Sequence, residues 1–153
     1  GKIERVKTLG AAHVINYREE DFADAVKTIT GKKGVDVILD HVGAAYLASN
    51  MKSLAVGGRL IIIGVISGIR AELNLALMMV KRQRIIGSVL RPRSVKEKAA
   101  IMAAFEAQVI PHLKDRRIVP VIHQVFPLEA VAEAHQMMED SRHFGKIVLR
   151  IAS

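Results

Sequence analysis

The chain has 153 residues, of which 50% are hydrophobic, and a formal net charge of +8 at pH 7. This length fits one ordinary domain or two small lobes. The absence of cysteine excludes disulfides, cysteine-ligated zinc and thiol nucleophiles from this chain. It also fits a reducing compartment, so a cytoplasmic location is expected. No apolar run approaches the roughly 20 residues that cross a bilayer, so no membrane partner is expected. The six histidines show no HExxH spacing that would indicate a metal site.

Helical and strand patterns alternate from the first residues. Residues 3–9 form the end of an expected helix, which Gly10 stops. Residues 13–17 are predicted to form a short strand. A helix is predicted over residues 19–30, because acidic residues in its first turn favour the helix dipole and Gly31 ends it.

The alternation continues up to residue 90. The predicted elements are a buried strand at residues 35–40, a short amphipathic helix at 45–54, a buried strand at 59–63, a helix at 73–81 and a strand at 84–90. Strands and helices that alternate in this way predict an α/β fold with a doubly wound parallel sheet.

A different segment follows residue 91. Ser94 is expected to cap a helix, with Glu97 completing a capping box. This helix is predicted over residues 95–114, with Pro111 bending or dividing it near its end. The remaining predicted elements are an extended run at residues 118–125 that Pro120 interrupts, a helix at 128–139 and a strand at 146–151. The segment therefore forms a different lobe, or a return into another one.

Two apolar runs, VDVILDHVG and GGRLIIIG, carry most of the information on function. Each is a short, β-branched stretch that a glycine closes, Gly43 in the first and Gly64 in the second, and such runs are typical of strands in a parallel sheet. Glycine at a strand end lets the backbone turn sharply and lets a ligand come close. Because ligands bind at the carboxyl edge of open α/β sheets, the runs predict a small-molecule or cofactor site there.

Basic residues form three groups, at residues 81–84, 91–98 and 114–117. Such a positive field attracts anions, among them nucleotide phosphates, acidic proteins and RNA. Nucleic-acid binding usually adds stacking aromatic side chains. The chain has two Tyr, four Phe and no Trp, and none is interleaved with the basic groups. Nucleic acid is therefore not the expected partner, and a non-enzymatic RNA-binding or regulatory module is kept as the alternative function.

Six segments in this order, KTLGAAHVINYREEDF, GVDVILDHVG, GGRLIIIG, LRPRS, FPLEAVAEAH and HFGKIVL, span the chain. Together they resemble zinc-free quinone oxidoreductases, the zeta-crystallin-like branch of the medium-chain dehydrogenase/reductase superfamily. Members of that branch begin with a barrel-like substrate domain, followed by the first strand of the nucleotide domain and its glycine-rich phosphate turn. No G-x-G-x-x-G pattern occurs in this chain.

The resemblance therefore implies a C-terminal part of such a reductase. Residues 1–91 would form an incomplete, doubly wound parallel (Rossmann-like) sheet that lacks its first strands and the glycine-rich loop. Residues 92–153 would form the C-terminal segment that returns to the catalytic domain. As such a part, the fragment alone is expected to show weak or no turnover.

The resemblance also implies the cofactor, NADPH, which gives a hydride to a quinone or an enone. Lys2 falls where the family's phosphate-binding lysine falls, and Tyr17 matches the tyrosine beside that phosphate. Val42 and its neighbours would lie against the adenosine or ribose. The further cofactor contacts that the resemblance implies, at two strand ends and in the return segment, are Ile63, Gly64, Val65, Val89, Leu90, Arg91 and His143.

No residue is assigned as catalytic. The sequence shows no Ser–His–Asp arrangement and no paired carboxylates for a common pocket. Asp40 is expected to form an Asx turn or a helix N-cap rather than to act in catalysis, and His41 is expected to be a surface histidine. The substrate-facing groups are expected in the half of the enzyme that this chain does not contain. An acyl-thioester enoyl reductase and an alcohol dehydrogenase relative stay open within the enzyme class.

The strand from Ile85 to Leu90 would be the last of the nucleotide domain and hence an edge strand. Exposed edges seek partners. In relatives two such edges pair across a two-fold axis, so the resemblance implies a homodimer through this strand.

Overall fold

The structure, a computed structural model, describes residues 1–151. It consists of two compact units, Gly1–Arg93 and Ser94–Ser153. The boundary falls just after the turn that follows the third strand. None of the helices in residues 1–151 has the length and apolar character that crossing a membrane requires.

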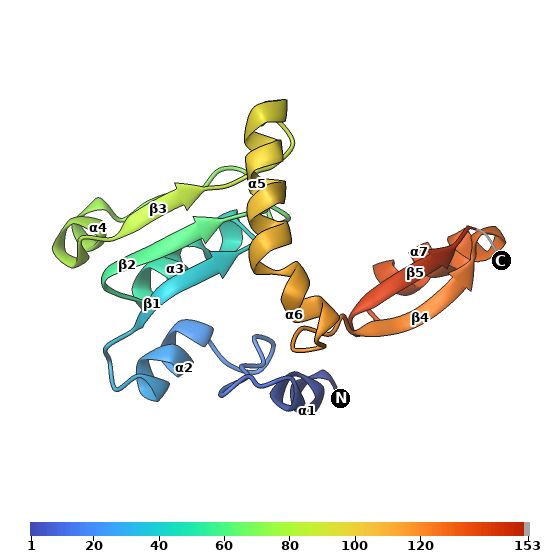
Figure 1. Cartoon of the computed structure of the whole chain (residues 1–153). Helices are drawn as coiled ribbons and strands as arrows, with labels where there is room; N and C mark the ends of the chain where they lie inside the picture. Colours follow the sequence, from blue (N-terminus) through green and yellow to red (C-terminus); the bar gives the residue numbers. More distant parts are fainter. Residues whose placement is uncertain (152–153) are drawn as a thin grey trace. The chain divides into compact units, whose positions relative to one another are not determined.

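The first unit is built on a three-stranded parallel sheet with the order β1-β2-β3 (Figure 1). The strands are β1 (Val35–Asp40), β2 (Leu54–Ile62) and β3 (Arg84–Gly87). Each strand is joined to the next through a helix, which confirms the predicted parallel α/β sheet.

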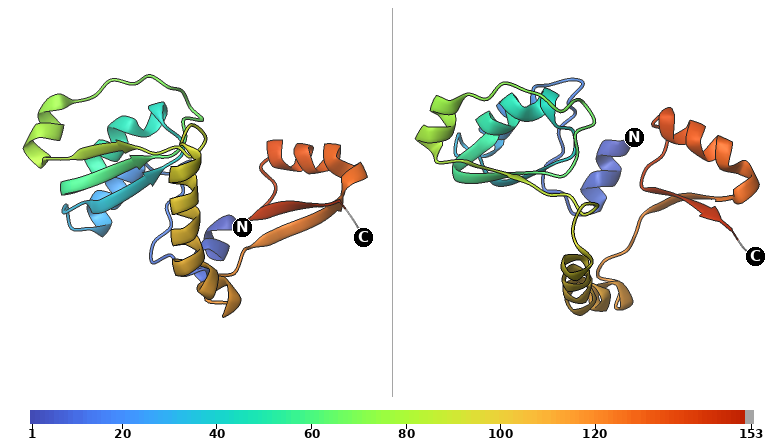
Figure 2. Two further views of the ribbon diagram at one scale, coloured as in Figure 1. Left: turned by 45° about the horizontal axis from the view of Figure 1, so that its top comes forward. Right: turned by 90° about the horizontal axis from the view of Figure 1, so that it is seen from above.

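Five helices accompany this sheet: α1 (Lys2–Thr8), α2 (Phe22–Ile29), the 3₁₀ helix η1 (Ala44–Tyr46), α3 (Leu47–Ser53) and α4 (Leu75–Lys81). Helices α3 and α4 lie on one face of the sheet (Figure 2). The core of this unit forms between them and β2, where Met51, Leu54 and Leu60 are almost completely buried. Asp21 begins α2 by accepting hydrogen bonds from the backbone N–H groups of Ala23 and Asp24.

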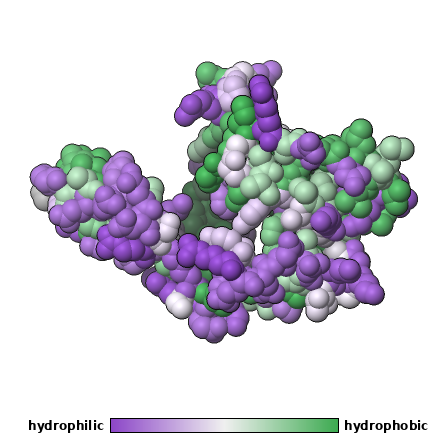
Figure 3. Space-filling view, turned by 180° about the vertical axis from the view of Figure 1, so that it is seen from behind, coloured by the Kyte–Doolittle hydropathy of each residue, from purple (hydrophilic) through white to green (hydrophobic). Residues whose placement is uncertain are grey.

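The other face of the sheet is bare in the described structure. Val37 and Leu39 of β1 are 45% and 63% exposed, and Ile86 of β3 is 42% exposed. A second apolar surface covers α4, where Leu75, Met79 and other side chains are largely exposed. Figure 3 shows apolar side chains gathered at the end of the unit that carries α4.

Two sequence predictions for the first unit are wrong. Residues 13–17 form no strand, because no strand among the described residues pairs with them and an isolated segment has no ladder. The strand predicted at residues 84–90 ends at Gly87, since β2 offers its last partner, Ile62, at that position.

The second unit is a long helix followed by a small β-α-β motif. Its elements are α5 (Val95–Gln108), α6 (Ile110–Lys114), β4 (Ile122–Pro127), η2 (Leu128–Ala130), α7 (Val131–Glu139) and β5 (Lys146–Arg150). Strands β4 and β5 pair in parallel, and Phe126 of β4 and Ala134 of α7 are buried.

Two predictions for this unit are confirmed. Ser94 and Glu97 form the predicted capping box, in which the Ser94 hydroxyl accepts from the Glu97 N–H at 3.2 Å and the Glu97 carboxylate accepts from the Ser94 N–H at 2.9 Å. The helical segment is divided at Val109, two residues before Pro111, into α5 and α6. That this unit returns to a catalytic domain stays a prediction.

Candidate functional site

The three parallel strands of the first unit end at one level. Asp40, the last residue of β1, pairs in register with Ile62 of β2, and Ile62 pairs with Gly87 of β3. The loops that follow the strands therefore leave the sheet together, at its carboxyl edge. We call this edge the carboxyl rim, and it is where open parallel sheets bind ligands.

Hydrogen bonds join the first two rim loops to each other. The Ile63 N–H donates to the Asp40 carbonyl at 2.7 Å, and the Ser67 N–H donates to the Val42 carbonyl at 2.8 Å. The Ser67 hydroxyl also donates to the Val42 carbonyl at 2.8 Å and accepts from the Ala45 N–H at 2.9 Å. The two loops form one backbone platform, since each fixes the position of the other.

Glycine permits this close approach of the loops. A Cβ atom at Gly64 would lie 2.7 Å from the carbonyl oxygen of His41, and one at Gly43 would lie 2.8 Å from Cα of Val65. Gly43 also has a φ of +90°, which L side chains rarely adopt. The glycines that close the two apolar runs are therefore required by packing at the rim.

Asp40 is buried at the end of β1, with 5% of its surface exposed. Its carboxylate accepts from the Val42 N–H at 2.7 Å and from the Gly43 N–H at 3.2 Å. This is the predicted Asx turn, and it holds the loop that leaves β1. His41 beside it is exposed, as predicted.

A cavity of about 240 Å³ opens at the β1 end of the carboxyl rim. Tyr17 comes to it from the segment before α2, and Val42 from the loop after β1. Phe22 and Tyr46 form part of its wall, and their rings pack at a centroid distance of 5.1 Å. An aromatic wall next to polar backbone suits the flat base and ribose of a nucleotide.

A second cavity of about 210 Å³ lies on the rim between the two loops. Gly43, Ile62 and Val65 line it, and Ile69 adds an apolar side. Among the hydrogen bonds within residues 1–151, none uses the backbone N–H of Gly64 or of Val65. These N–H groups are available to a ligand that carries carbonyl or amide oxygens.

Comparison with known families decides the affiliation of the chain. The family model described as "Zinc-binding dehydrogenase" matches residues 9–149. The chain belongs to this family. It is a C-terminal fragment of a medium-chain dehydrogenase/reductase protein, and its fold matches the C-terminal, Rossmann-like, cofactor-binding half of such enzymes.

Individual relatives of this family agree. The human protein named "Quinone oxidoreductase" is 36% identical over 142 residues, which are 92% of this chain and 41% of that protein. A solved structure titled "NAD-dependent alcohol dehydrogenase" superposes with a TM-score of 0.77 at 36% identity, over 99% of this chain and 41% of that one. The structure titled "CurF ER cyclopropanase from curacin A biosynthetic pathway" gives 0.80 at 27% identity, over 99% and 44%. The chain thus spans about two fifths of the length of these relatives.

Several residues that the sequence predicts for cofactor contact lie on the rim of this dehydrogenase fold. Tyr17 and Val42 meet in one cavity, and Val65 lines the neighbouring one. Ile63 and Gly64 follow β2 directly, and Ile63 is 48% exposed. The three predicted residues that follow β3, in a segment without regular structure, are Val89, Leu90 and Arg91.

Seven of the ten predicted residues line neither cavity, namely Lys2, Ile63, Gly64, Val89, Leu90, Arg91 and His143. Lys2 lies in α1, is exposed, and lines none of the cavities described for the molecule. His143 belongs to the second unit, in the loop between α7 and β5, and is partly buried. Its Nδ1 atom is buried without a hydrogen-bond partner in the described structure. Their cofactor roles stay predictions.

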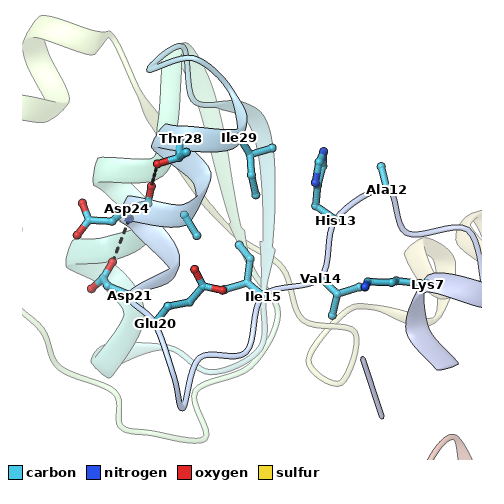
Figure 4. Close-up of a pocket in the computed structure, with 11 residues that line it drawn as sticks. Lys7, Ala12, His13, Val14, Ile15, Glu20, Asp21, Asp24, Thr28 and Ile29 are labelled. Carbon is cyan, nitrogen blue, oxygen red and sulfur yellow. Dashed lines mark hydrogen bonds between the residues drawn. The ribbon is translucent and has the colours of Figure 1, made fainter. Parts of the chain in front are cut away.

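A further cavity, of about 720 Å³, is larger than the two at the carboxyl rim and lies elsewhere in the first unit. Figure 4 shows Lys7 and His13 on one side of it and Asp21 and Asp24 of the α2 region on the other. It is a wide groove with mixed charges, and no group of His, Asp or Glu within residues 1–151 is arranged to hold a metal ion. The polar groups of this groove do not converge on one point, so its volume alone does not identify it as the candidate functional site.

Sequence reasoning missed residues that shape the rim. Ser67 ties the two loops together, and Phe22 packs against Tyr46 across 24 positions of the sequence. Asn50 of α3, which is 3% exposed, also lines the Tyr17 cavity. The position of Ser67 between two glycines, after a buried strand, was the one feature of the sequence that could have indicated its role in joining the loops. No pattern in the sequence pairs Phe22 with Tyr46.

Proposed function

We propose that the protein to which this chain belongs is an NADPH-dependent oxidoreductase that reduces quinones or enones by hydride transfer. The chain would supply the C-terminal, cofactor-binding part. The observation that carries the proposal is the carboxyl rim itself, a glycine-closed backbone platform with unused N–H groups and two small cavities. The likeness to the human quinone oxidoreductase supports the substrate class.

The residues of the rim fit a nicotinamide dinucleotide. The N–H groups of Gly64 and Val65 would donate to the carboxamide, and the Tyr17 cavity would take the adenosine half. The neighbouring apolar side chains would exclude water from the nicotinamide side. Bound NADPH supplies the hydride, so the work of this chain is to hold and orient it.

The preference for NADPH over NADH would come from Lys2 and Tyr17. A ribose phosphate needs a fixed positive charge and a hydroxyl donor, and these two residues carry those groups. Arg18 follows Tyr17 and is exposed, so it would add a second positive charge.

The test measures the affinity of the full chain for NADPH and NADH by isothermal titration calorimetry. The Tyr17→Phe and Lys2→Ala variants are expected to weaken NADPH binding about tenfold and to leave NADH binding unchanged, because each would remove a group that we assign to the phosphate only. Lys7→Ala is the control, because Lys7 lies on the same helix and pairs with Glu4 at 2.9 Å. Equal affinity of the unaltered chain for the two nucleotides would contradict the phosphate assignment.

A second candidate within the enzyme class is an enoyl reductase that acts on acyl thioesters. The observation that favours it is the likeness to the CurF ER structure, at 27% identity and a TM-score of 0.80. Full-length protein that oxidises NADPH with a short enoyl thioester, and not with a quinone, would select this candidate.

The alternative of an RNA-binding module rests on the +8 charge alone. It requires binding that falls steeply with salt on a log–log plot. Absence of RNA binding at about 0.1 M salt would remove it, since exposed charges are screened beyond roughly 10 Å there.

A further inference from the structure

A fourth cavity lies at the opposite end of the same sheet. Gly34 and Ser53, which line it, directly precede β1 and β2, and Lys81, which also lines it, lies three residues before β3. The cavity therefore sits at the amino ends of the strands and has a volume of about 270 Å³. At about 3.3 Å per residue, the six-residue β1 separates it from the carboxyl rim by roughly 20 Å.

Four lysines line this cavity, and they come from four different places in the first unit. The four are Lys27 from α2, Lys32 from the turn after it, Lys52 from α3 and Lys81 from α4. Asp24 is the one acidic residue among the lining residues. Four positive charges against one negative charge leave three positive charges around a small space.

Lys81 is the fixed member of this lysine pocket. Its ammonium donates to the carbonyl oxygens of Lys52 at 2.9 Å and of Leu54 at 2.7 Å. An ammonium has three N–H donors, so one remains for a ligand. The side chain is partly buried, and its position is set before any ligand arrives.

The backbone also brings the other lysines close. Lys32 adopts a left-handed conformation, with a φ of +69°, and its N–H donates to the carbonyl of Lys27 at 2.7 Å. A Cβ atom at Gly34 would lie 2.6 Å from the carbonyl oxygen of Ser53, so the floor of the pocket is tightly packed. No ion pair within residues 1–151 involves Lys27, Lys32 or Lys52.

We propose that this lysine pocket binds a small inorganic polyanion of the pyrophosphate class. A single phosphate group carries only about −1.5 to −2 at pH 7, so the net charge of the pocket calls for more than one such group. Its volume lies just below the roughly 300–1,000 Å³ of cavities for drug-sized ligands, which favours a compact ion over a nucleotide.

The test is titration of the full chain with inorganic pyrophosphate at about 0.1 M salt, where long-range attraction is screened, followed by calorimetry and by the amide NMR shifts of Gly34 and Ser53. Lys27→Gln and Lys52→Gln are each expected to raise Kd about fivefold, since each removes a partly exposed charge contact. Lys33→Gln is the matched control, because Lys33 neighbours Lys32 and carries the same charge but does not line the pocket.

The proposal is overturned by absence of binding, or by an equal loss in Lys33→Gln, which would mean attraction by the general positive field only. Shifts confined to Val42 and Val65 would place the anion at the carboxyl rim and also overturn it. Tyr17→Phe is expected to leave pyrophosphate binding unchanged, so this result is independent of the proposed cofactor site.

Discussion

Cα of Gly64 faces the carbonyl oxygen of His41 so closely that a Cβ atom at this position would lie 2.7 Å from it. The contact joins the loop after β2 to the loop after β1. The same two loops are held together by Ile63 and Asp40, one residue earlier in each. The close approach of these two loops at this point thus depends on the lack of a side chain at Gly64.

Replacement of Gly64 by alanine is expected to destabilise the first unit by about 1–3 kcal/mol, because backbone atoms must move to admit the methyl group. Gly87→Ala is the matched control, since Gly87 also lies at the carboxyl rim, as the last residue of β3, and a Cβ there meets nothing within 4 Å. The measurement is the midpoint of urea unfolding for both variants. Equal midpoints would show that the loops can separate at little cost.

Replacement of Asp40 by alanine is expected to loosen the first rim loop. The N–H groups of Val42 and Gly43 would lose their acceptor in a buried place, at a cost of about 1–3 kcal/mol. Asp40→Asn keeps one acceptor oxygen and is expected to lose less. Urea unfolding and amide hydrogen exchange at Val42 and Gly43 measure the two effects, and a larger loss in the asparagine variant would contradict the Asx turn as their cause.

The sheet of the first unit could be predicted because its strands are continuous apolar runs. Those runs correspond to β1 and β2, although β2 begins at Leu54, five residues before the predicted start. Residues 13–17 have a similar pattern but form no strand, because strand formation depends on a neighbour that no local pattern reveals. The same runs are typical of strands that helices cover on both sheet faces, yet Val37 and Leu39 of β1 are 45% and 63% exposed.

The sequence predicted the backbone loops of the candidate site, but not the side chains that form the wall of the Tyr17 cavity. Gly43 and Gly64 stand out because glycine follows a buried strand at each. The wall of the cavity depends on Phe22 and Tyr46, whose pairing arises from how α2 and η1 pack. Such contacts arise from tertiary structure, and the hydrophobic periodicity of the sequence does not predict them.

Replacement of Ser94 by alanine is expected to destabilise α5 by about 1 kcal/mol, because it removes the N-cap and with it half of the capping box. Ser94→Asp keeps an acceptor at the same place and is expected to retain most of the stability. Far-UV circular dichroism during urea unfolding compares the two. An alanine variant as stable as the aspartate variant would show that α5 does not depend on this cap.

The free edge of β3 leads to a prediction about assembly. Within residues 1–151, β3 pairs only with β2, so its other edge is open, and the neighbouring α4 exposes Met79 and Val80 at 76% and 77%. An open edge beside an apolar surface is a site for pairing with a second copy of the chain.

Light scattering is expected to find a dimer, and Gly87→Pro is expected to disperse it. Proline removes the N–H at the edge, so residue 87 could no longer donate a hydrogen bond to a partner strand. Gly87→Ala keeps that N–H and is expected to stay dimeric. A proline variant of unchanged mass would exclude β3 as the interface, and a dimer lost in both variants would point to a general effect on folding.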